Sequence, residues 1–128
     1  PASPRHRLSY PWNLLLAGDV LGYLGDLSQL FSRARELLSK DGVFVFTVEK
    51  MTTETHQHQH QTGEDDGNQL GSSPSYVLAE GGRFVHSKSY VERLAEKSGF
   101  KVVSCESSIL RTQNGSPVEG IVYVFFAT

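Results

Sequence analysis

Cysteine, long apolar runs and clusters of basic residues are scarce or missing in this 128-residue sequence. The single cysteine, Cys105, has no partner for an internal disulfide, and no stretch approaches the ~18 consecutive apolar residues of a membrane helix. The twelve Lys and Arg residues are dispersed and the net charge is −2, so no positive surface for a nucleic-acid backbone is predicted. We therefore expect a soluble protein of a reducing, intracellular compartment, most consistent with the cytoplasm, that contacts neither membrane nor nucleic acid.

Methionine is also scarce, because Met51 is the only one and the first residue is Pro1. Residues 1–11 show neither the apolar run of a signal peptide nor an Arg-rich amphipathic pattern. We interpret residues 1–11 as a linker or a truncated edge, and the chain as a piece of a longer protein. Residues 12–128 are then predicted to form one partial domain.

Two apolar segments in the first third of the chain predict strands. Trp12 to Ala17 is nearly continuous in apolar residues and is closed by Gly18 and Asp19, which is typical of a strand buried on both faces. Val43 to Val48 is β-branched and aromatic throughout, which predicts another strand in the middle of a covered sheet.

Between these strands, Asp26 to Ser39 has the apolar spacing of an amphipathic helix. Asp26 with Gln29 predicts a capping box at its start, and Asp41-Gly42 is expected to supply the left-handed residue that ends it. A strand, a helix and a strand at this spacing predict a parallel crossover.

A polar stretch from about residue 51 to 75 interrupts the pattern and contains scarcely any apolar side chain. We interpret it as a disordered insertion in a loop. His56, His58 and His60 alternate with glutamines there, which indicates low complexity rather than a metal site, so no metal is predicted.

The last third of the chain predicts a helix and a hairpin. Ser89 with Glu92 predicts a capping box for a helix of about ten residues that Gly99 closes. Strands are expected over residues 101–110 and 118–127, joined by a turn at Asn114-Gly115. The predicted order is β-α-β-loop-α-β-β, with the last two strands antiparallel and Cys105 as a buried, inert thiol within the first of them.

This order, and two segments within it, resemble the class I S-adenosylmethionine-dependent methyltransferases. Asn13-Leu-Leu-Leu-Ala-Gly-Asp-Val-Leu-Gly-Tyr-Leu-Gly-Asp-Leu27 is similar to the family's fourth strand and following loop, where a D-V-L-x-x-L run is common. Leu37-Leu-Ser-Lys-Asp-Gly-Val-Phe-Val-Phe46 resembles its L-L-K-P-G-G helix end and fifth strand, with Ser39-Lys-Asp-Gly in place of the proline-glycine turn. The resemblance implies an α/β fold, the C-terminal half of a Rossmann-like methyltransferase sheet.

A third segment narrows the resemblance. Gly82-Arg-Phe-Val-His-Ser-Lys-Ser-Tyr90, followed by Leu94-Ala-Glu-Lys-Ser-Gly-Phe100, is similar to a methyltransferase branch often found beside tetratricopeptide repeats. In the family, the glycine-rich loop and the acidic residue that hold most of the cofactor lie in the first half, and this chain contains no Gly-x-Gly motif. We therefore expect this chain alone to bind S-adenosylmethionine weakly or not at all and to be inactive by itself.

The resemblance also implies candidate cofactor-binding residues at the end of the first strand. The backbone of Gly18 and Asp19 would line the methionine end of the cofactor, and Tyr23 would reach toward the methyl donor or acceptor. The alternative is that Asp19 only caps a turn, Gly18 only permits it and Tyr23 packs. Because open α/β sheets bind ligands beyond the carboxyl ends of their strands, these residues lie on the functional edge of the predicted sheet. The functional and structural interpretations weigh equally for Gly18 and Asp19, and the structural one is favoured for Tyr23.

Three further side chains are candidates for chemistry. Glu49 and Lys50 end the second buried strand, where they either face the acceptor or pair with each other in solvent. His86 precedes the second helix and is a weak candidate for a catalytic base, since a lone surface histidine is more often without function. The catalytic residues are otherwise unknown.

Three functions are compatible with the sequence. The first is an S-adenosylmethionine-dependent methyltransferase that acts on a small molecule or a protein. The alternative is a non-catalytic interaction module derived from that fold, which pairs with another chain through an exposed sheet edge. A third, the back half of a nucleotide-dependent dehydrogenase, is disfavoured by the predicted antiparallel hairpin.

Overall fold

The computed structural model describes residues 11–51 and 74–128 of the chain. The segments at residues 1–10 and 52–73, which include most of the predicted linker, most of the predicted insertion and the three alternating histidines, lie outside the described residues. In chain order the elements are β1 (Trp12–Ala17), the 3-10 helix η2 (Leu21–Tyr23), α1 (Ser28–Leu37), β2 (Leu38–Glu49), β3 (Tyr76–Leu78), β4 (Phe84–His86), α3 (Lys88–Lys97), β5 (Phe100–Gln113) and β6 (Ser116–Ala127).

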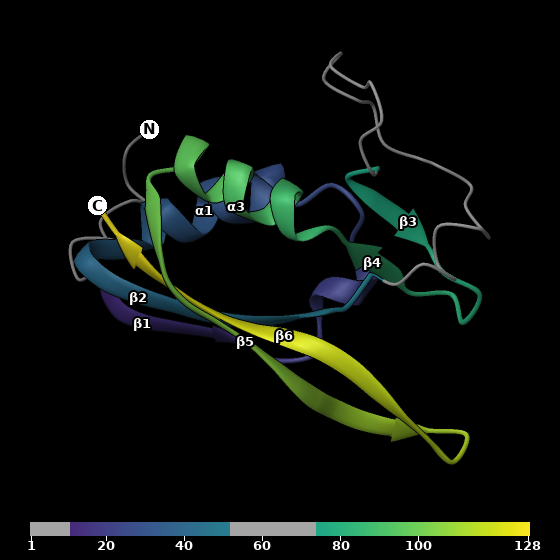
Figure 1. Ribbon diagram of the computed structural model, residues 1–128. Coiled ribbons are helices and arrows are strands. Elements are labelled where there is room, and N and C mark those ends of the chain that lie inside the picture. The colour runs from purple at the N-terminus through teal and green to yellow at the C-terminus, as the bar shows by residue number, and fades with distance from the viewer. Residues whose placement is uncertain (1–10, 52–73) are drawn as a thin grey trace, which may run out of the picture.

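Four strands form one mixed sheet in the order β1-β2-β6-β5 (Figure 1). β1 and β2 are parallel, with Ala17 paired to Phe46. β6 is antiparallel to β2 on one side and to β5 on the other. The predicted parallel crossover pair and the predicted terminal hairpin are therefore both confirmed.

The hairpin turn follows from its sequence. Asn114 and Gly115 have φ angles of 53° and 81°. Two consecutive left-handed residues match the twist of the flanking strands, and Asn-Gly adopts that conformation at the lowest steric cost. Beyond the part of β6 that pairs with β2, the β5–β6 hairpin extends past the rest of the sheet (Figure 1).

The helices are present where they were predicted, but their ends differ. α1 begins at Ser28 because the Asp26 carboxylate accepts hydrogen bonds from the backbone N–H and the hydroxyl of Ser28, at 2.8 and 2.6 Å, instead of forming a capping box with Gln29. α1 passes directly into β2 at Leu38, so Asp41, with φ 69°, lies inside the strand and does not end the helix. Neither α-helix in the described ranges is long and apolar enough to cross a membrane.

The N-cap of α3 is two residues earlier than predicted. Ser87, rather than Ser89, is the N-cap, and its hydroxyl accepts a hydrogen bond from the Tyr90 N–H at 3.1 Å. Gly99 follows the helix with φ 92°, as the sequence predicts. The chain then enters β5 at Phe100.

A small two-stranded sheet was not predicted. β3 and β4 pair antiparallel, with Val77 opposite Val85, and both of these valines are buried. Each strand has only three residues, which is too short to show a two-residue periodicity. Lys50 at the end of β2 forms an isolated parallel bridge with His86, which joins this small sheet to the main one.

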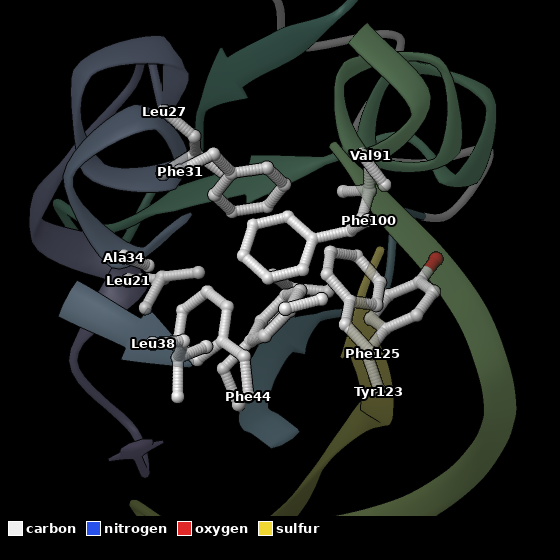
Figure 2. Close-up of a cluster of buried hydrophobic side chains, with 14 of the residues drawn as sticks. Leu21, Leu27, Phe31, Ala34, Leu38, Phe44, Val91, Phe100, Tyr123 and Phe125 are labelled. Carbon is white, nitrogen blue, oxygen red and sulfur yellow. The ribbon is translucent and has the colours of Figure 1, made fainter. Parts of the chain in front are cut away.

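The hydrophobic core lies between the main sheet and the two helices, α1 and α3, which both cover the same face (Figure 1). Phe31 of α1 packs into this core with its ring 5.5 Å from that of Phe125 (Figure 2). Its ring also lies 5.4 Å from that of Phe46. Aromatic pairs at these separations add to the free energy gained by burying apolar area. The core therefore depends on alternate residues of β2 and β6.

No helix of the described residues covers the other face of the sheet (Figure 1). β1 was expected to be buried on both faces, and that prediction is wrong, because only Leu15 and Ala17 pack against the core while Leu16 is 70% exposed. On β5 this outer face is polar, since Lys101 and Glu106 lie opposite Phe126 and Val122. The apolar side chains of the outer face are Trp12, Leu14, Leu16, Val43, Val45, Val122, Val124 and Phe126.

Candidate functional site

The carboxyl ends of the two parallel strands bring Asp19 and Glu49 to the same edge of the sheet. Asp19 follows β1 in a left-handed conformation, with φ 58°, and its backbone N–H donates to Thr47 Oγ1 of β2 at 2.8 Å. Glu49 is the last residue of β2. A non-glycine residue at positive φ is uncommon, and Asp is among the residues that tolerate it best. The hydrogen bond to Thr47 fixes that backbone conformation.

Arg111 of β5 connects the two carboxylates. Its Nη1 donates to Asp19 Oδ1 and its Nη2 donates to Glu49 Oε2, each at 2.6 Å. Gln113 Oε1 accepts from Nε and Nη2 of the same guanidinium at 3.3 and 3.1 Å. The hydrogen bond to Glu49, followed by the charges of Glu49 and Asp19, raises the pKa of Arg111, although burial acts in the opposite direction. The guanidinium therefore stays charged.

A second guanidinium, that of Arg83, lies on the same two carboxylates. Its Nη1 is 3.6 Å from Asp19 Oδ1 and its Nε is 3.9 Å from Glu49 Oε2. Nη2 donates to the Tyr23 hydroxyl at 3.2 Å, and the guanidinium carbon lies 4.9 Å from the centre of the Tyr23 ring. Arg83 Nη1 is buried and makes no hydrogen bond within the described residues, so it is not accessible to a ligand.

The four charged side chains differ in exposure, and that difference decides which of them faces a ligand. The Asp19 side chain is 42% exposed, against 22% for Arg83, 19% for Arg111 and 14% for Glu49. The donors of the arginines are thus directed inward, at Oδ1 of Asp19 and Oε2 of Glu49. Among the described residues, no hydrogen bond to Asp19 Oδ2 is found. The group that this cluster presents to solvent is the Asp19 carboxylate.

The other two predicted cofactor-binding residues flank Asp19. A Cβ atom placed on Gly18 would have no neighbour within 4 Å, so the backbone there borders open space. Tyr23 is 66% exposed even though Arg83 contacts its ring and hydroxyl. The structure therefore brings Gly18, Asp19 and Tyr23 together on one accessible surface.

The predicted pair of Glu49 and Lys50 does not form. Glu49 contacts Arg111 and Arg83, whereas Lys50 lies 4.0 Å from Glu119 of β6. Consecutive residues at the end of a strand point to opposite faces, which is why their side chains separate. Only Glu49 belongs to the cluster with Asp19.

His86 is buried, with only 1% of its surface exposed, and is not the surface histidine that the sequence suggested. Its Nε2 lies 2.9 and 3.1 Å from the carbonyl oxygens of Leu24 and Gly25, so Nε2 carries the proton and donates it. Burial lowers the pKa of His86 to about 4. The neutral ring ties β4 to the loop that follows η2.

Two other predictions concern metals and the thiol. The described part of the chain contains no group of His, Cys, Asp and Glu side chains arranged to hold a metal ion. Cys105 is half-buried rather than fully buried, and it packs against the core from β5.

Arg83 and Arg111 were missed by reasoning from the sequence. Arg83 lies in the Gly82–Tyr90 segment but carries no predicted role there, and Arg111 belongs to no recognisable motif. The two arginines are 28 residues apart in the chain. Arg111 lies just past the predicted end of its strand, because the strand continues to Gln113. The only available signal was the Asn114-Gly115 turn, whose register places Arg111 opposite Val118 on the last strand.

No protein-family model and no curated protein matches the sequence. Solved structures do match the fold. A SAM-dependent methyltransferase from Methanosarcina mazei aligns with a TM-score of 0.65 and 13% identity, over 91% of this chain and 59% of that chain. One from Mesorhizobium loti aligns with a TM-score of 0.59 and 18% identity, over 91% of this chain and 62% of that one.

Magnesium protoporphyrin IX methyltransferase from Synechocystis, crystallised with bound SAH, has a TM-score of 0.59 and 9% identity, over 94% of this chain and 48% of its own. The chain thus spans about three fifths or less of the length of these structures. The fold is the predicted one, mixed α/β and Rossmann-like, of the type found in S-adenosylmethionine-dependent methyltransferases.

Proposed function

We propose that the chain is part of an S-adenosylmethionine-dependent methyltransferase and that the surface formed by Gly18, Asp19 and Tyr23 contributes to its cofactor site. The observation that carries the proposal is the exposed Asp19 carboxylate beside the open backbone of Gly18, at the carboxyl edge of the parallel strands. Ligands of open α/β sheets bind beyond that edge. The methyltransferase fold supports the same assignment.

The residues present fit one end of S-adenosylmethionine. The space beside Gly18 admits a ligand against the backbone, and the Asp19 carboxylate offers an acceptor for the amino group of the methionine end. When bound, S-adenosylmethionine supplies a methyl group on a sulfonium, which a nucleophile displaces in line. The chain has no Gly-x-Gly loop for the rest of the cofactor, so its own affinity is weak.

The methyl acceptor is a small molecule or a protein side chain. Tyr23, exposed at the rim of the site, is in position to contact it. His86 is neutral at physiological pH, but its burial and its hydrogen bonds to Leu24 and Gly25 favour a structural role over that of a base. The similarity to the branch found beside tetratricopeptide repeats remains a prediction.

Titration calorimetry with S-adenosylhomocysteine tests the cofactor proposal on this chain and on one extended upstream by about 100 residues, the length of a missing half-domain. We expect binding by the longer chain, and Asp19→Asn in it to weaken the affinity about tenfold, as loss of a charge-assisted hydrogen bond does. Methylthioadenosine, which lacks the amino-acid end, should bind equally to both forms. No binding to either chain would refute the proposal.

A second candidate function, a non-catalytic interaction module, is favoured by a different observation. β1 is an edge strand of the sheet, and Trp12, Leu14 and Leu16 on it are 59%, 51% and 70% exposed. An open edge beside exposed apolar side chains provides both main-chain hydrogen bonds and apolar area to another chain. If neither chain binds S-adenosylhomocysteine, this function becomes the stronger candidate.

A further inference from the structure

Arg111 donates a hydrogen bond to each of the two carboxylates of the candidate site. It lies 92 residues from Asp19 and 62 from Glu49 in the sequence, yet it donates to both carboxylates at 2.6 Å. The planar guanidinium presents its two terminal nitrogens side by side, so one group serves two acceptors. A lysine ammonium in the same place has no such fork.

The two carboxylates depend on this contact. Without Arg111, Asp19 and Glu49 would face each other with only Arg83 between them, at 3.6 and 3.9 Å. Two like charges at a half-buried position repel each other, so the more exposed one is expected to turn toward solvent. That side chain is Asp19.

Arg111 is itself held in place. Gln113 accepts from two of its nitrogens, and the neighbouring Leu110 packs so closely over Gly120 that a Cβ there would lie 2.3 Å from Leu110 Cδ1. The part of the β5–β6 hairpin that carries Arg111 is therefore closely packed beside Val48 of β2. A fixed donor can define the direction of the acceptor that it binds.

We propose that Arg111 is a positioning residue, which holds Asp19 Oδ1 so that Oδ2 is presented to a hydrogen-bond donor of the ligand. Arg111 does not touch the ligand, because its hydrogen-bonding nitrogens are already directed at Asp19, Glu49 and Gln113. The identity of the ligand as S-adenosylmethionine rests on the proposed function. The positioning of Asp19 by Arg111 is independent of the proposed function.

Amide hydrogen exchange, measured by NMR on this chain, tests the positioning without any ligand. In Arg111→Gln, we expect the Asp19 N–H, which donates to Thr47 Oγ1, to exchange about tenfold faster, while amides of the β1–β2 ladder keep their rates. Arg111→Lys should give an intermediate rate, because it keeps the charge and loses the fork. The control is Arg33→Gln, which removes only an exposed ion pair with Glu36 on α1.

Equal exchange rates of the Asp19 N–H in Arg111→Gln and in Arg33→Gln would overturn the inference, whether or not S-adenosylhomocysteine binds. Faster exchange of the Asp19 N–H in Arg111→Gln, together with no binding of S-adenosylhomocysteine to either chain, would support the positioning of Asp19 and refute the methyltransferase proposal. Where S-adenosylhomocysteine binds, a double-mutant cycle gives a second readout. Arg111→Gln should weaken affinity in the Asp19 form and have little further effect in Asp19→Asn, whereas additive losses would show that Arg111 does not act through Asp19.

Discussion

His86 shows how one buried side chain joins two segments at the candidate site. Its Nε2 donates to the carbonyls of Leu24 and Gly25, and its ring packs beside Tyr90 with 6.3 Å between centroids. Tyr90 in turn accepts a hydrogen bond from the Leu27 N–H at 2.9 Å, and burial raises its pKa to about 12. The loop after η2 is therefore held by two aromatic side chains of the following segment.

His86 also makes stability depend on pH. Its pKa is lowered from 6.5 to about 4 in the folded chain, so the unfolded state binds the proton more readily between these values. Stability is therefore lost as pH falls from about 6.5 toward 4, by roughly 3 kcal/mol in total. Urea unfolding at several pH values should show this slope, and His86→Gln, which keeps a donor and does not titrate, should remove most of it. If the free energy of unfolding changes with pH equally in the unmodified chain and in His86→Gln, His86 is not the group responsible.

At the scale of elements, the β5–β6 hairpin depends on a close approach at Gly120. A Cβ there would lie 2.3 Å from Leu110 Cδ1 and 2.6 Å from the Val48 carbonyl oxygen. The leucine can rotate, but the strand backbone of β2 cannot move away without loosening the sheet.

Gly120→Ala should therefore destabilise the chain by about 1–3 kcal/mol, the usual cost of overpacking. The measurement is the free energy of unfolding in urea. Gly18→Ala is the matched control, since its Cβ meets nothing within 4 Å, and it should unfold almost like the unmodified chain. A similar loss of unfolding free energy in both variants would show that it comes from replacing any glycine by alanine, and not from the close approach at Gly120.

Elements with a strong periodicity were predictable from the sequence, and those held by tertiary contacts were not. β1, α1, α3 and the final hairpin carry apolar patterns that fix their type, with Asn114-Gly115 marking the turn. The start of α1 was misplaced because the Asp26 carboxylate accepts from the amide two residues on rather than three. The start of α3 was misplaced because its N-cap, Ser87, has Tyr90 rather than Glu or Gln three residues on, so the capping-box pattern pointed to Ser89 instead. β3 and β4 are held by their partner and by Lys50, which no local pattern reveals.

The candidate site was predictable only where a local sequence pattern marks its residues. Gly18 and Asp19 directly follow a recognisable strand, and the edge rule for α/β sheets predicts their position at the carboxyl end of β1. Arg83 and Arg111 reach the site through strand pairings far along the chain. Their positions depend on how distant strands pair, and the local sequence around each arginine does not reveal that pairing.

At the scale of the whole molecule, the described residues 11–51 and 74–128 cover the sheet with helices on one face only. Leu14 and Leu16 are more than half exposed on the outer face, whereas Leu15 between them packs against the core. Exposed apolar area of this kind promotes association.

Leu14→Lys with Leu16→Lys should therefore reduce self-association of the chain at high concentration and change the free energy of unfolding little. Sedimentation velocity, paired with urea unfolding, measures both quantities. Leu15→Lys is the matched control: it places a charge against the core and should destabilise the fold strongly. Unchanged sedimentation in the double variant would show that this face does not drive association.

The ion pairs of the candidate site have a consequence for the order of folding. Asp19, Glu49, Arg83 and Arg111 come from four separate segments of the chain, and the contacts of Arg111 close loops of 92 and 62 residues. Contacts so distant in sequence carry a large entropic cost, so they form after the shorter-range pairing of β5 with β6. Removing Arg111 should therefore accelerate unfolding and leave the refolding rate nearly unchanged, which makes the site the last part of the chain to assemble and the first to come apart.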